Sequence, residues 1–284
     1  MKNEERPLPP EIRVLDLTDP AWDGDLLVPF AVDELEIANV GRGAPPLLHF
    51  WVHRRGLAVG IRDAKLPGAV GAMEALERQG VRTAVRHSGG AAVPLDEGVL
   101  NVSLIVPKPP AALDFRGDFA RMVALLQTAV RALGRELAQG EVAGSYCPGE
   151  FDLSIDGRKF CGIAQRRQTK AIAVQALVVV EGRGEERLAQ ARAFYDRAVG
   201  DAARAADRCD RRLCYPKLKS GTVASLAESG MPGITVERFK AEVLDALSEL
   251  GAAVTDYARA VPYDPQLLAE TAAAIRRRYA APSG

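Results

Sequence analysis

Apolar and polar positions along the chain alternate between short runs that suit strands and longer runs with helical spacing. Residues 115–137 give the clearest helical pattern, because their apolar side chains recur every three or four positions. The apolar residues of this stretch are Phe119, Met122, Val123, Leu126, Val130, Leu133 and Leu137. Helices are also predicted over 68–78, before Gly80, and over 185–199. We expect the apolar stripe of the first helix to face a core.

Shorter apolar runs predict β-strands. They cover residues 47–52, 56–61, 81–86, 100–106, 151–155, 160–165 and 171–180. The first two lie on either side of a polar turn, and Asp156-Gly157 is typical of a tight hairpin turn. Strands and helices interleave without a regular βαβ order, so the pattern predicts an α+β fold with a mixed β-sheet packed by helices.

The same pattern suggests three parts of the chain: an N-terminal segment (1–29), a central domain (30–232) and a C-terminal helical extension (233–284). In the extension, two amphipathic helices are predicted over 236–250 and 265–279, with a loop between them. The whole chain has 284 residues, 48% of them hydrophobic, which is enough for one sizeable core with a small satellite.

The charge balance and the cysteine content indicate which partners and which cell compartment to expect. Lys and Arg total 37 and Asp and Glu total 37, so no net charge attracts nucleic acid or an anionic membrane. The four cysteines are sparse and irregularly spaced, which favours a reducing compartment over a disulfide framework. The polar start (1–10) lacks the apolar stretch of a signal peptide, and the longest apolar run (171–180) is half a membrane span. We therefore expect a cytoplasmic protein with neither nucleic acid nor membrane as a partner.

Several common catalytic motifs are missing from the sequence. It has no G-x-x-x-x-G-K-[ST] phosphate loop, no G-x-S-x-G nucleophile elbow and no H-E-x-x-H zinc motif. The three histidines all lie in the first third of the chain, which gives little support to a catalytic triad. Cys209 and Cys214 lack the further ligands that structural zinc needs, so two ordinary loop thiols are expected there.

Three segments could carry chemistry, although each also has a plain structural explanation. Residues 86–93 (RHSGGAAV) follow a predicted strand, and the glycines either leave bare backbone for a ligand or form an ordinary turn. Cys147 lies in a loop of small residues and proline, where it is either an exposed nucleophile or an ordinary thiol. Lys159 follows the predicted hairpin turn, and its ammonium either points into a pocket or is solvated at a sheet edge.

Together these segments resemble the lipoate-protein ligase and octanoyltransferase family, whose catalytic domain is related to biotin protein ligase. The family pattern is R-R-x-x-G-G-G-A-V-x-H-D-x-G followed later by D-G-x-K-x-x-G-x-A-Q, and residues 86–98 and 156–165 match it in order. The chain departs from this pattern at His87, Ala91 and Leu95. With a cysteine at position 147, these departures look more like the amidotransferase branch of the family than like its ATP-dependent ligases.

The resemblance implies a biotin/lipoate ligase-like catalytic domain and a ping-pong acyl transfer. Cys147 would take an octanoyl or lipoyl group from a lysine of the glycine cleavage H protein. It would pass the group to a lysine in the lipoyl domain of a 2-oxoacid dehydrogenase acyltransferase subunit. No ATP, metal or other cofactor is expected, because exchange between two lysine amides is close to thermoneutral. Alternatives are an octanoyltransferase that uses acyl carrier protein, an ATP-dependent lipoate ligase, and a non-catalytic subunit that binds lipoyl domains.

The resemblance and the charges also suggest residue roles. Lys159 is expected to stabilise the Cys147 thiolate and to polarise the acyl carbonyl. Cys161 is the rival nucleophile, but its neighbours suggest a small packed residue. Asp96 and Asp152 are expected to be structural anchors rather than acids. The acyl chain, whose burial contributes about 0.8 kcal/mol per CH₂, is expected along the glycine turn. The residues expected to bind it are Arg86, Ser88, Gly89, Gly90, Val93, Val102, Gly162 and Ala164.

Overall fold

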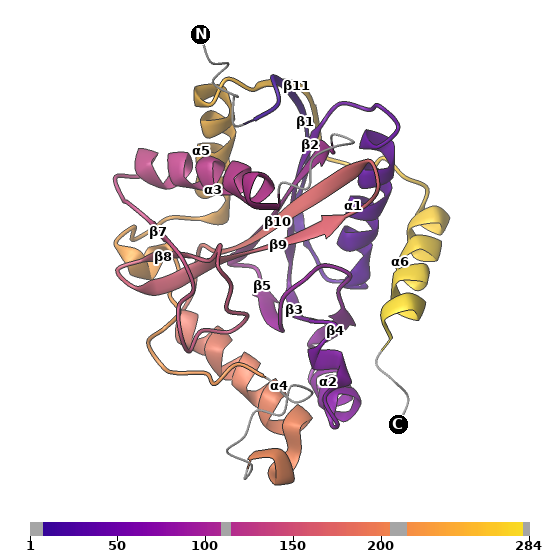
Figure 1. Ribbon diagram of the computed structural model, residues 1–284, viewed down its shortest axis with the longest axis vertical. Coiled ribbons are helices and arrows are strands. Elements are labelled where there is room, and N and C mark those ends of the chain that lie inside the picture. Colours follow the sequence, from indigo (N-terminus) through magenta and orange to yellow (C-terminus); the bar gives the residue numbers. More distant parts are fainter. Residues whose placement is uncertain (1–7, 109–114, 205–214, 281–284) are drawn as a thin grey trace.

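The computed structural model describes residues 8–108, 115–204 and 215–280, which form two β-sheets and six α-helices within these ranges (Figure 1). The larger sheet contains β1 (Glu11–Trp22), β2 (Leu47–His53), β6 (Val99–Pro107), β7 (Ala138–Gln139), β8 (Leu153–Ile155), β9 (Arg158–Arg167), β10 (Ala171–Val179) and β11 (Ala253–Ala258). The smaller sheet contains β3 (Arg55–Val59), β4 (Arg82–Val85) and β5 (Val93–Asp96). The helices are α1 (Leu27–Val40), α2 (Ala69–Glu77), α3 (Phe115–Ala132), α4 (Gly184–Arg204), α5 (Val236–Glu249) and α6 (Pro265–Tyr279).

The larger sheet is mixed, as predicted. Its strand order is β11-β1-β2-β6-β10-β9-β8-β7, and that of the smaller sheet is β4-β3-β5. Strand β1 runs parallel to β11 and β2, whereas β2, β6, β10 and β9 pair antiparallel in succession. The pairing therefore confirms the α+β fold with a mixed sheet.

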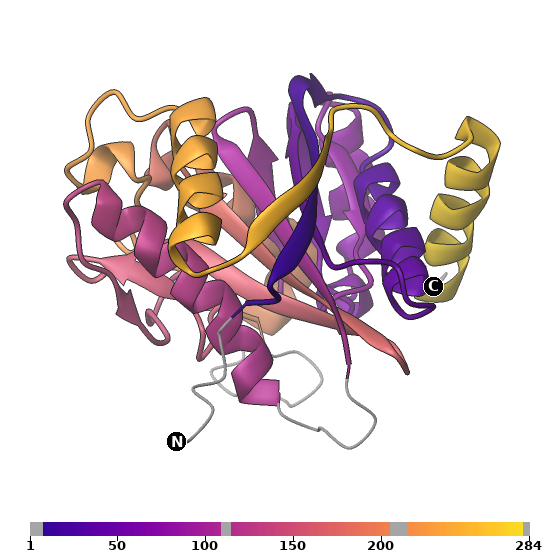
Figure 2. The same ribbon diagram turned by 90° about the horizontal axis from the view of Figure 1, so that it is seen from above.

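Helices cover both faces of the larger sheet. Figure 2 shows α3 and α5 on one side of it and α1 and α6 on the other. All residues of β2 are buried, as expected for a strand covered on both faces. One apolar cluster lies between the sheet and the α3–α5 layer, and a second lies on the α1–α6 side and extends toward the smaller sheet.

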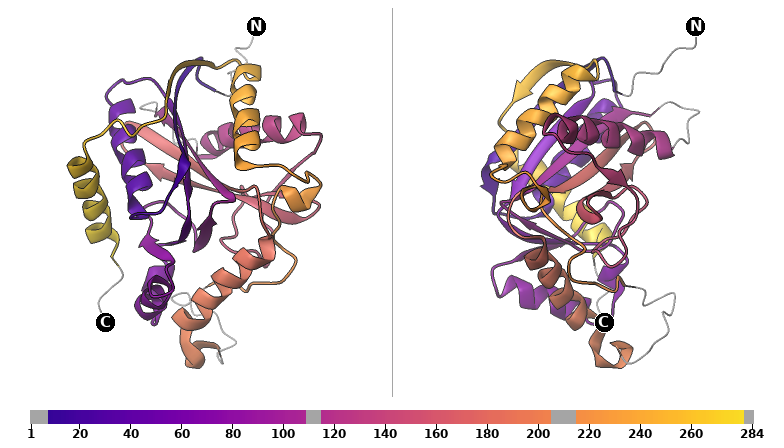
Figure 3. Two further views of the ribbon diagram at one scale, coloured as in Figure 1. Left: turned by 180° about the vertical axis from the view of Figure 1, so that it is seen from behind. Right: turned by 90° about the vertical axis from the view of Figure 1, so that its left-hand side faces the viewer.

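The smaller sheet packs against a separate pair of helices. Helices α2 and α4 lie side by side at the end of the molecule away from α5, as Figures 1 and 3 show. Their contacts with β3 and β4 form a third apolar cluster that includes Leu57, Val85 and Phe194. The polar turn after β2 leads the chain from the larger sheet into the smaller one. Strands β2 and β3 therefore belong to different sheets and do not form a hairpin.

Two local predictions can be compared directly with the backbone. Asp156 and Gly157, with φ of 51° and 75°, turn the chain between the antiparallel strands β8 and β9, which confirms the predicted hairpin. Helix α3 ends at Ala132 rather than at 137, because Gly134 adopts φ 76° and terminates it. Leu133 and Leu137 still pack against the core from the segment that follows.

The terminal segments contribute more to the sheet than the sequence predicted. Strand β1 lies in the N-terminal segment, for which no strand was predicted, and it is the second strand of the larger sheet. The predicted loop between the two C-terminal helices contains β11, the edge strand beside β1. The two helices occur almost as predicted, with N-caps at Thr235 and Asp264.

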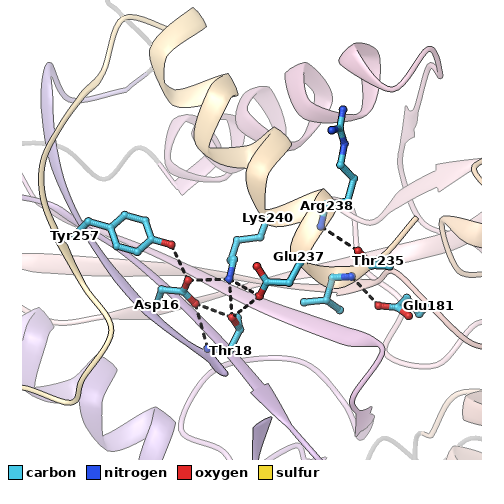
Figure 4. Close-up of polar contacts among 9 residues, drawn as sticks. Asp16, Thr18, Glu181, Thr235, Glu237, Arg238, Lys240 and Tyr257 are labelled. Carbon is cyan, nitrogen blue, oxygen red and sulfur yellow. Dashed lines mark hydrogen bonds and ion pairs between the residues drawn. The ribbon is translucent and has the colours of Figure 1, made fainter. Parts of the chain in front are cut away.

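A buried polar cluster connects the C-terminal segment to β1. The Lys240 ammonium on α5 donates hydrogen bonds to Asp16 and Thr18 on β1 and to Glu237, and the Tyr257 hydroxyl on β11 donates to Asp16 (Figure 4). Residues after 232 are therefore tied to the core of the larger sheet. No helix in the described part of the chain has the length and apolar character to cross a membrane.

Candidate active site

The three chemistry-bearing segments converge on one cavity of about 430 Å³. Cys147 lines it from the loop before β8, and its thiol is partly exposed. The backbone of Cys147 has a φ of 48°, a left-handed conformation that non-glycine residues adopt rarely. Such strain persists only where the surrounding contacts hold it, and it concentrates at functional sites.

The glycine turn lies directly against the Cys147 thiol. Sγ accepts a hydrogen bond from the Ala91 N–H at 3.0 Å, and Nη2 of Arg86 lies 3.5 Å away. Nη2 of Arg86 also donates to the Ala91 carbonyl at 2.7 Å. A β-carbon at Gly90 would lie 2.6 Å from Sγ, so glycine is needed for this approach. The thiol therefore faces a cation and a backbone N–H donor.

Close packing beneath the turn holds it in place. A β-carbon at Gly60 would lie 2.1 Å from the Gly90 carbonyl, so only glycine lets the end of β3 approach this closely. The Ala92 N–H and the Tyr195 hydroxyl both donate to the Asp63 carboxylate, which joins α4 to the turn. Burial raises the pKa of Asp63 against the effect of these hydrogen bonds. Sequence reasoning missed Gly60, Asp63 and Tyr195, which come from separate segments.

Lys159 lies beside the nucleophile, and its ammonium bonds to the backbone of the nucleophile loop. Its ammonium is buried and donates to the backbone carbonyls of Tyr146 and Cys147 at 3.0 and 2.6 Å. It also forms an ion pair with Asp152 Oδ2 at 2.8 Å. Nη2 of Arg86 is a cation 3.5 Å from Sγ. The sequence had suggested Lys159 for this role, and that suggestion stays a prediction, since the hydrogen bonds of Lys159 reach the backbone of the loop.

Asp152 is the partner of Lys159 at the end of the nucleophile loop. Its Oδ2 also accepts a hydrogen bond from the Gly149 N–H at 3.0 Å. Burial raises the pKa of Asp152 to about 6, although the Lys159 ammonium acts in the opposite direction. These contacts agree with the anchoring role that the sequence suggested for Asp152. Asp96 is likewise an ion-pair partner, of Arg187 on α4.

Cys161 lies at the base of the same cavity with a different environment. It is 1% exposed, and burial raises the pKa of its thiol well above the ordinary range. Cys147 is the more accessible of the two, and the Arg86 guanidinium lies 3.5 Å from its sulfur. Cys209 and Cys214 lie outside the described residues. Among the residues that are described, no group of three or more His, Cys, Asp and Glu side chains is placed to hold a metal ion.

Most residues that the sequence suggested for acyl binding line this cavity. They are Arg86, Gly89, Gly90, Val93, Gly162 and Ala164. Ser88 does not line it: its side chain is buried, and its oxygen has no hydrogen-bond partner within the described chain. Val102 points into the apolar cluster on the α3–α5 side of the sheet instead, because alternate residues of β6 face opposite sides.

Apolar residues that sequence reasoning did not single out complete the walls. Phe119 and Phe151 stack with ring centroids 4.2 Å apart, and Leu177 and Val179 contribute from β10. A smaller cavity of about 30 Å³ shares four lining residues with the first: Arg86, Val93, Gly162 and Leu177. Its other apolar lining residues are Phe30, Trp51, Ala58, Leu95 and Ala176. Three polar residues, Asn101, Ser103 and Gln175, also line it. The shared residues place the smaller cavity next to the first one, on the side of Phe30 in α1.

Comparison with known proteins shows the family to which the chain belongs. The sequence matches the family model described as Lipoyl protein ligase A/B catalytic domain over residues 25–248. A relative from Anoxybacillus flavithermus, named octanoyl-[GcvH]:protein N-octanoyltransferase, is 39% identical over 240 residues, which cover 84% of each chain. The protein of the same name from Bacillus velezensis is 38% identical over 242 residues, 85% of this chain and 83% of that one.

Solved structures show the same fold at lower identity. A lipoate-protein ligase A bound with ATP has a TM-score of 0.66 and 18% identity, with 95% of each chain covered. A structure of a bi-partite lipoate protein ligase and its E2 lipoyl domain from Thermoplasma acidophilum has a TM-score of 0.64 and 19% identity, covering 95% of this chain and 93% of that one. The chain therefore belongs to the lipoyl protein ligase A/B catalytic domain family, as an acyltransferase among its N-octanoyltransferases.

Proposed function

We propose that this protein moves an octanoyl group from a lysine of the glycine cleavage H protein to a lysine of a lipoyl domain, through a thioester on Cys147. The observation that carries the proposal is the position of Sγ at a largely apolar cavity, 3.0 Å from the Ala91 N–H and 3.5 Å from Arg86. The names of the relatives supply octanoyl-GcvH as donor and a protein as acceptor. Lipoyl domains are the acceptors that the family resemblance implies.

In the first half-reaction, Sγ of Cys147 attacks the carbonyl carbon of the octanoyl-lysine amide. The C–S bond forms, the C–N bond breaks, and the proton that the thiol gives up ends on the departing lysine amine. The cation of Arg86 and the Ala91 N–H stabilise the attacking thiolate. The same donors would also stabilise the negative charge that develops on the carbonyl oxygen and so lower the barrier further.

In the second half-reaction, the neutral amine of the acceptor lysine attacks the thioester carbonyl. An amide forms, the C–S bond breaks, and the amine proton returns to the sulfur. Donor and acceptor are both lysine amides, so the overall exchange is nearly thermoneutral and needs no ATP or metal. We place the reaction in the cytoplasm, where a free thiol remains reduced.

The octanoyl chain would extend from Cys147 along Val93 and Leu177 into the smaller cavity beyond them. Phe30, Trp51 and Ala58 would then surround its methyl end. Each CH₂ moved from water into this environment contributes about 0.8 kcal/mol, so a medium chain gains several kcal/mol over a short one.

A transfer assay with three alternative donors tests the donor assignment. Purified enzyme and a lipoyl domain are mixed with octanoylated H protein, with octanoylated acyl carrier protein, or with octanoate and ATP. We expect acylated lipoyl domain from the H protein without ATP. Transfer from the carrier protein alone, or pyrophosphate release with octanoate, would establish one of the enzyme alternatives. If no donor gave transfer, the non-catalytic alternative would stand.

A further inference from the structure

A buried ion pair lies directly behind the nucleophile loop. Asp152 and Lys159 are both 2% exposed, and their Oδ2 and Nζ atoms are 2.8 Å apart. Removing two charges from water is unfavourable, and a buried pair adds little stability compared with apolar residues of similar size. Its presence beside the thiol calls for a role other than stabilisation of the fold.

The hydrogen-bonding capacity of Lys159 is fully used. An ammonium has three N–H donors, and here they match the Tyr146 carbonyl, the Cys147 carbonyl and Asp152. In this structure two of the three donors hold the nucleophile loop and one holds Asp152. Lys159 therefore acts on the backbone of the loop.

The two carbonyl contacts lie on either side of one α-carbon. The Tyr146 carbonyl belongs to the peptide plane before the Cys147 Cα, and the Cys147 carbonyl belongs to the plane after it. Because peptide units are planar, holding both fixes the φ and ψ of Cys147 and hence the direction of its Cα–Cβ bond. This explains how a φ of 48° is maintained at a non-glycine residue. In this conformation Sγ meets Ala91 and Arg86.

We propose that Asp152 is a positioning residue for acyl transfer, acting through Lys159: it fixes the Lys159 ammonium, which fixes both peptides of Cys147 and aims the thiol. Asp152 also holds the loop directly through the Gly149 N–H at 3.0 Å. A β-carbon at Gly162 would lie 3.3 Å from Nζ of Lys159, so the strand leaves just enough room for the ammonium. The proposal rests on the proposed function only for its acyl-transfer readout.

The test is a double-mutant cycle with Asp152→Asn, Lys159→Met and the double variant. Single-turnover thioester formation is measured over a range of octanoylated H protein concentrations. Each single variant should lower the maximal rate by about 10- to 100-fold, as expected for a misplaced reacting group, with less than about a twofold change in the half-saturating concentration. Because both residues act through one set of contacts, the double variant should be no slower than the slower single variant. The double variant also removes both buried charges, which favours its folding.

Two outcomes would overturn the proposal. One is a maximal rate for Asp152→Asn within twofold of wild type. The other is a double variant whose fold reduction in maximal rate equals the product of the reductions in the two single variants. The rate of Cys147 alkylation by iodoacetamide near pH 7 is measured in parallel, without any acyl donor. It should show the same non-additive loss. If the wild-type protein formed no thioester but the alkylation cycle held, the proposed function would fail while the positioning role stood.

A second buried ion pair provides the matched control. Lys240 and Asp16 are also buried, and their Nζ and Oδ2 atoms are 2.7 Å apart, but they lie between α5 and β1 (Figure 4). Asp16→Asn and Lys240→Met should lower the melting temperature and leave Cys147 alkylation unchanged. If these control variants slowed alkylation as much as the Asp152 and Lys159 variants do, a general loss of stability would explain both, and the positioning role would be wrong.

Discussion

The Cys147 thiol lies 3.0 Å from the Ala91 N–H and 3.5 Å from the Arg86 guanidinium, so a change at either neighbour should alter how it reacts. The contact that matters most is with the glycine turn, where the Ala91 N–H meets Sγ and where Gly90 leaves space for it. Adjacent glycines in this turn differ sharply. A β-carbon at Gly90 would collide with Sγ, whereas one at Gly89 would meet nothing within 4 Å.

Gly90→Ala should slow both thioester formation and Cys147 alkylation by at least about tenfold, because the new methyl group displaces Sγ or Arg86. The φ of 95° at this position adds a stability cost of about 1 kcal/mol. Gly89→Ala is the control, and its rate of Cys147 alkylation, which needs no acyl donor, should stay within twofold of wild type. Iodoacetamide kinetics and thermal melting measure both effects. Equal rates for the two variants would contradict the geometry of the turn.

Arg86→Met should slow Cys147 alkylation at pH 7 by about tenfold, because it removes the cation 3.5 Å from Sγ. Alkylation measured across pH distinguishes loss of thiolate, which a higher pH restores, from loss of access, which it does not. Arg54→Met, at an exposed arginine, is the control. An unchanged profile for Arg86→Met would show that the arginine does not stabilise the thiolate.

The sequence motifs were sufficient to bring Cys147, Arg86 and the glycine turn together, but they could not orient Lys159. A motif gives spacing along the chain, whereas the direction of Lys159 depends on β9 pairing with both β8 and β10. The supporting residues Gly60, Asp63 and Tyr195 form no local pattern. They meet the glycine turn only after β3 and α4 have packed together.

Helices and strands whose apolar residues recur at a regular spacing could be predicted from the sequence, and those without such a spacing could not. Helix α3 has one apolar face and was found, apart from its end. Helix α1 was missed because its sequence is apolar around much of its circumference, with Pro29 in its first turn and buried Asp33 and Glu36 in its interior. Strand β11 is an almost fully exposed edge strand, so no alternation of buried and exposed positions marks it.

The cluster that joins α5 and β11 to β1 predicts a large effect on stability. Lys240→Met leaves the buried Asp16 carboxylate unpaired and should lower the free energy of unfolding by about 3–5 kcal/mol. Adding Asp16→Asn should recover most of that loss. Urea unfolding followed by circular dichroism measures both variants. A loss below about 1 kcal/mol for Lys240→Met would mean that the C-terminal segment is not held through this cluster.

The same cluster predicts in which direction pH changes the stability of the fold. Burial opposes ionisation of Asp16, but hydrogen bonds from Lys240, Tyr257 and Thr18 outweigh it and lower the pKa of Asp16 below 3.8. A lowered carboxyl pKa stabilises the fold above the unfolded-state pKa, and this contribution is lost as pH falls through the folded-state value. Wild type should therefore lose stability below about pH 4 more steeply than the double variant Asp16→Asn/Lys240→Met. Parallel unfolding curves at each pH would show that Asp16 does not contribute.

At the scale of the whole molecule, the two sheets and α1 enclose the path that we assign to the acyl chain. The smaller cavity lies where β3 and β5 of the smaller sheet approach β6 and β10 of the larger one. The length of acyl group that fits is therefore a property of how the sheets pack, and no single motif encodes it.

Ala58→Phe should fill the smaller cavity and shift the preference from octanoyl toward shorter acyl groups. Each CH₂ excluded from the cavity forfeits about 0.8 kcal/mol, which corresponds to about fourfold in the specificity for the longer chain. Transfer of butanoyl, hexanoyl and octanoyl groups from acylated H protein measures the shift. Val70→Phe, in a separate groove beside α2, is the control and should change nothing. An unaltered octanoyl preference in Ala58→Phe would place the acyl chain elsewhere.

Intact-protein mass spectrometry measures the covalent state of Cys147 during turnover directly. The protein is mixed with octanoylated H protein without acceptor, quenched in acid and weighed, and the modified peptide is sequenced. We predict a gain of one octanoyl group on Cys147, which is lost on addition of a lipoyl domain or hydroxylamine and is absent in Cys147→Ser. Transfer at the wild-type rate by Cys147→Ser, or an octanoyl group on Cys161 instead, would contradict it.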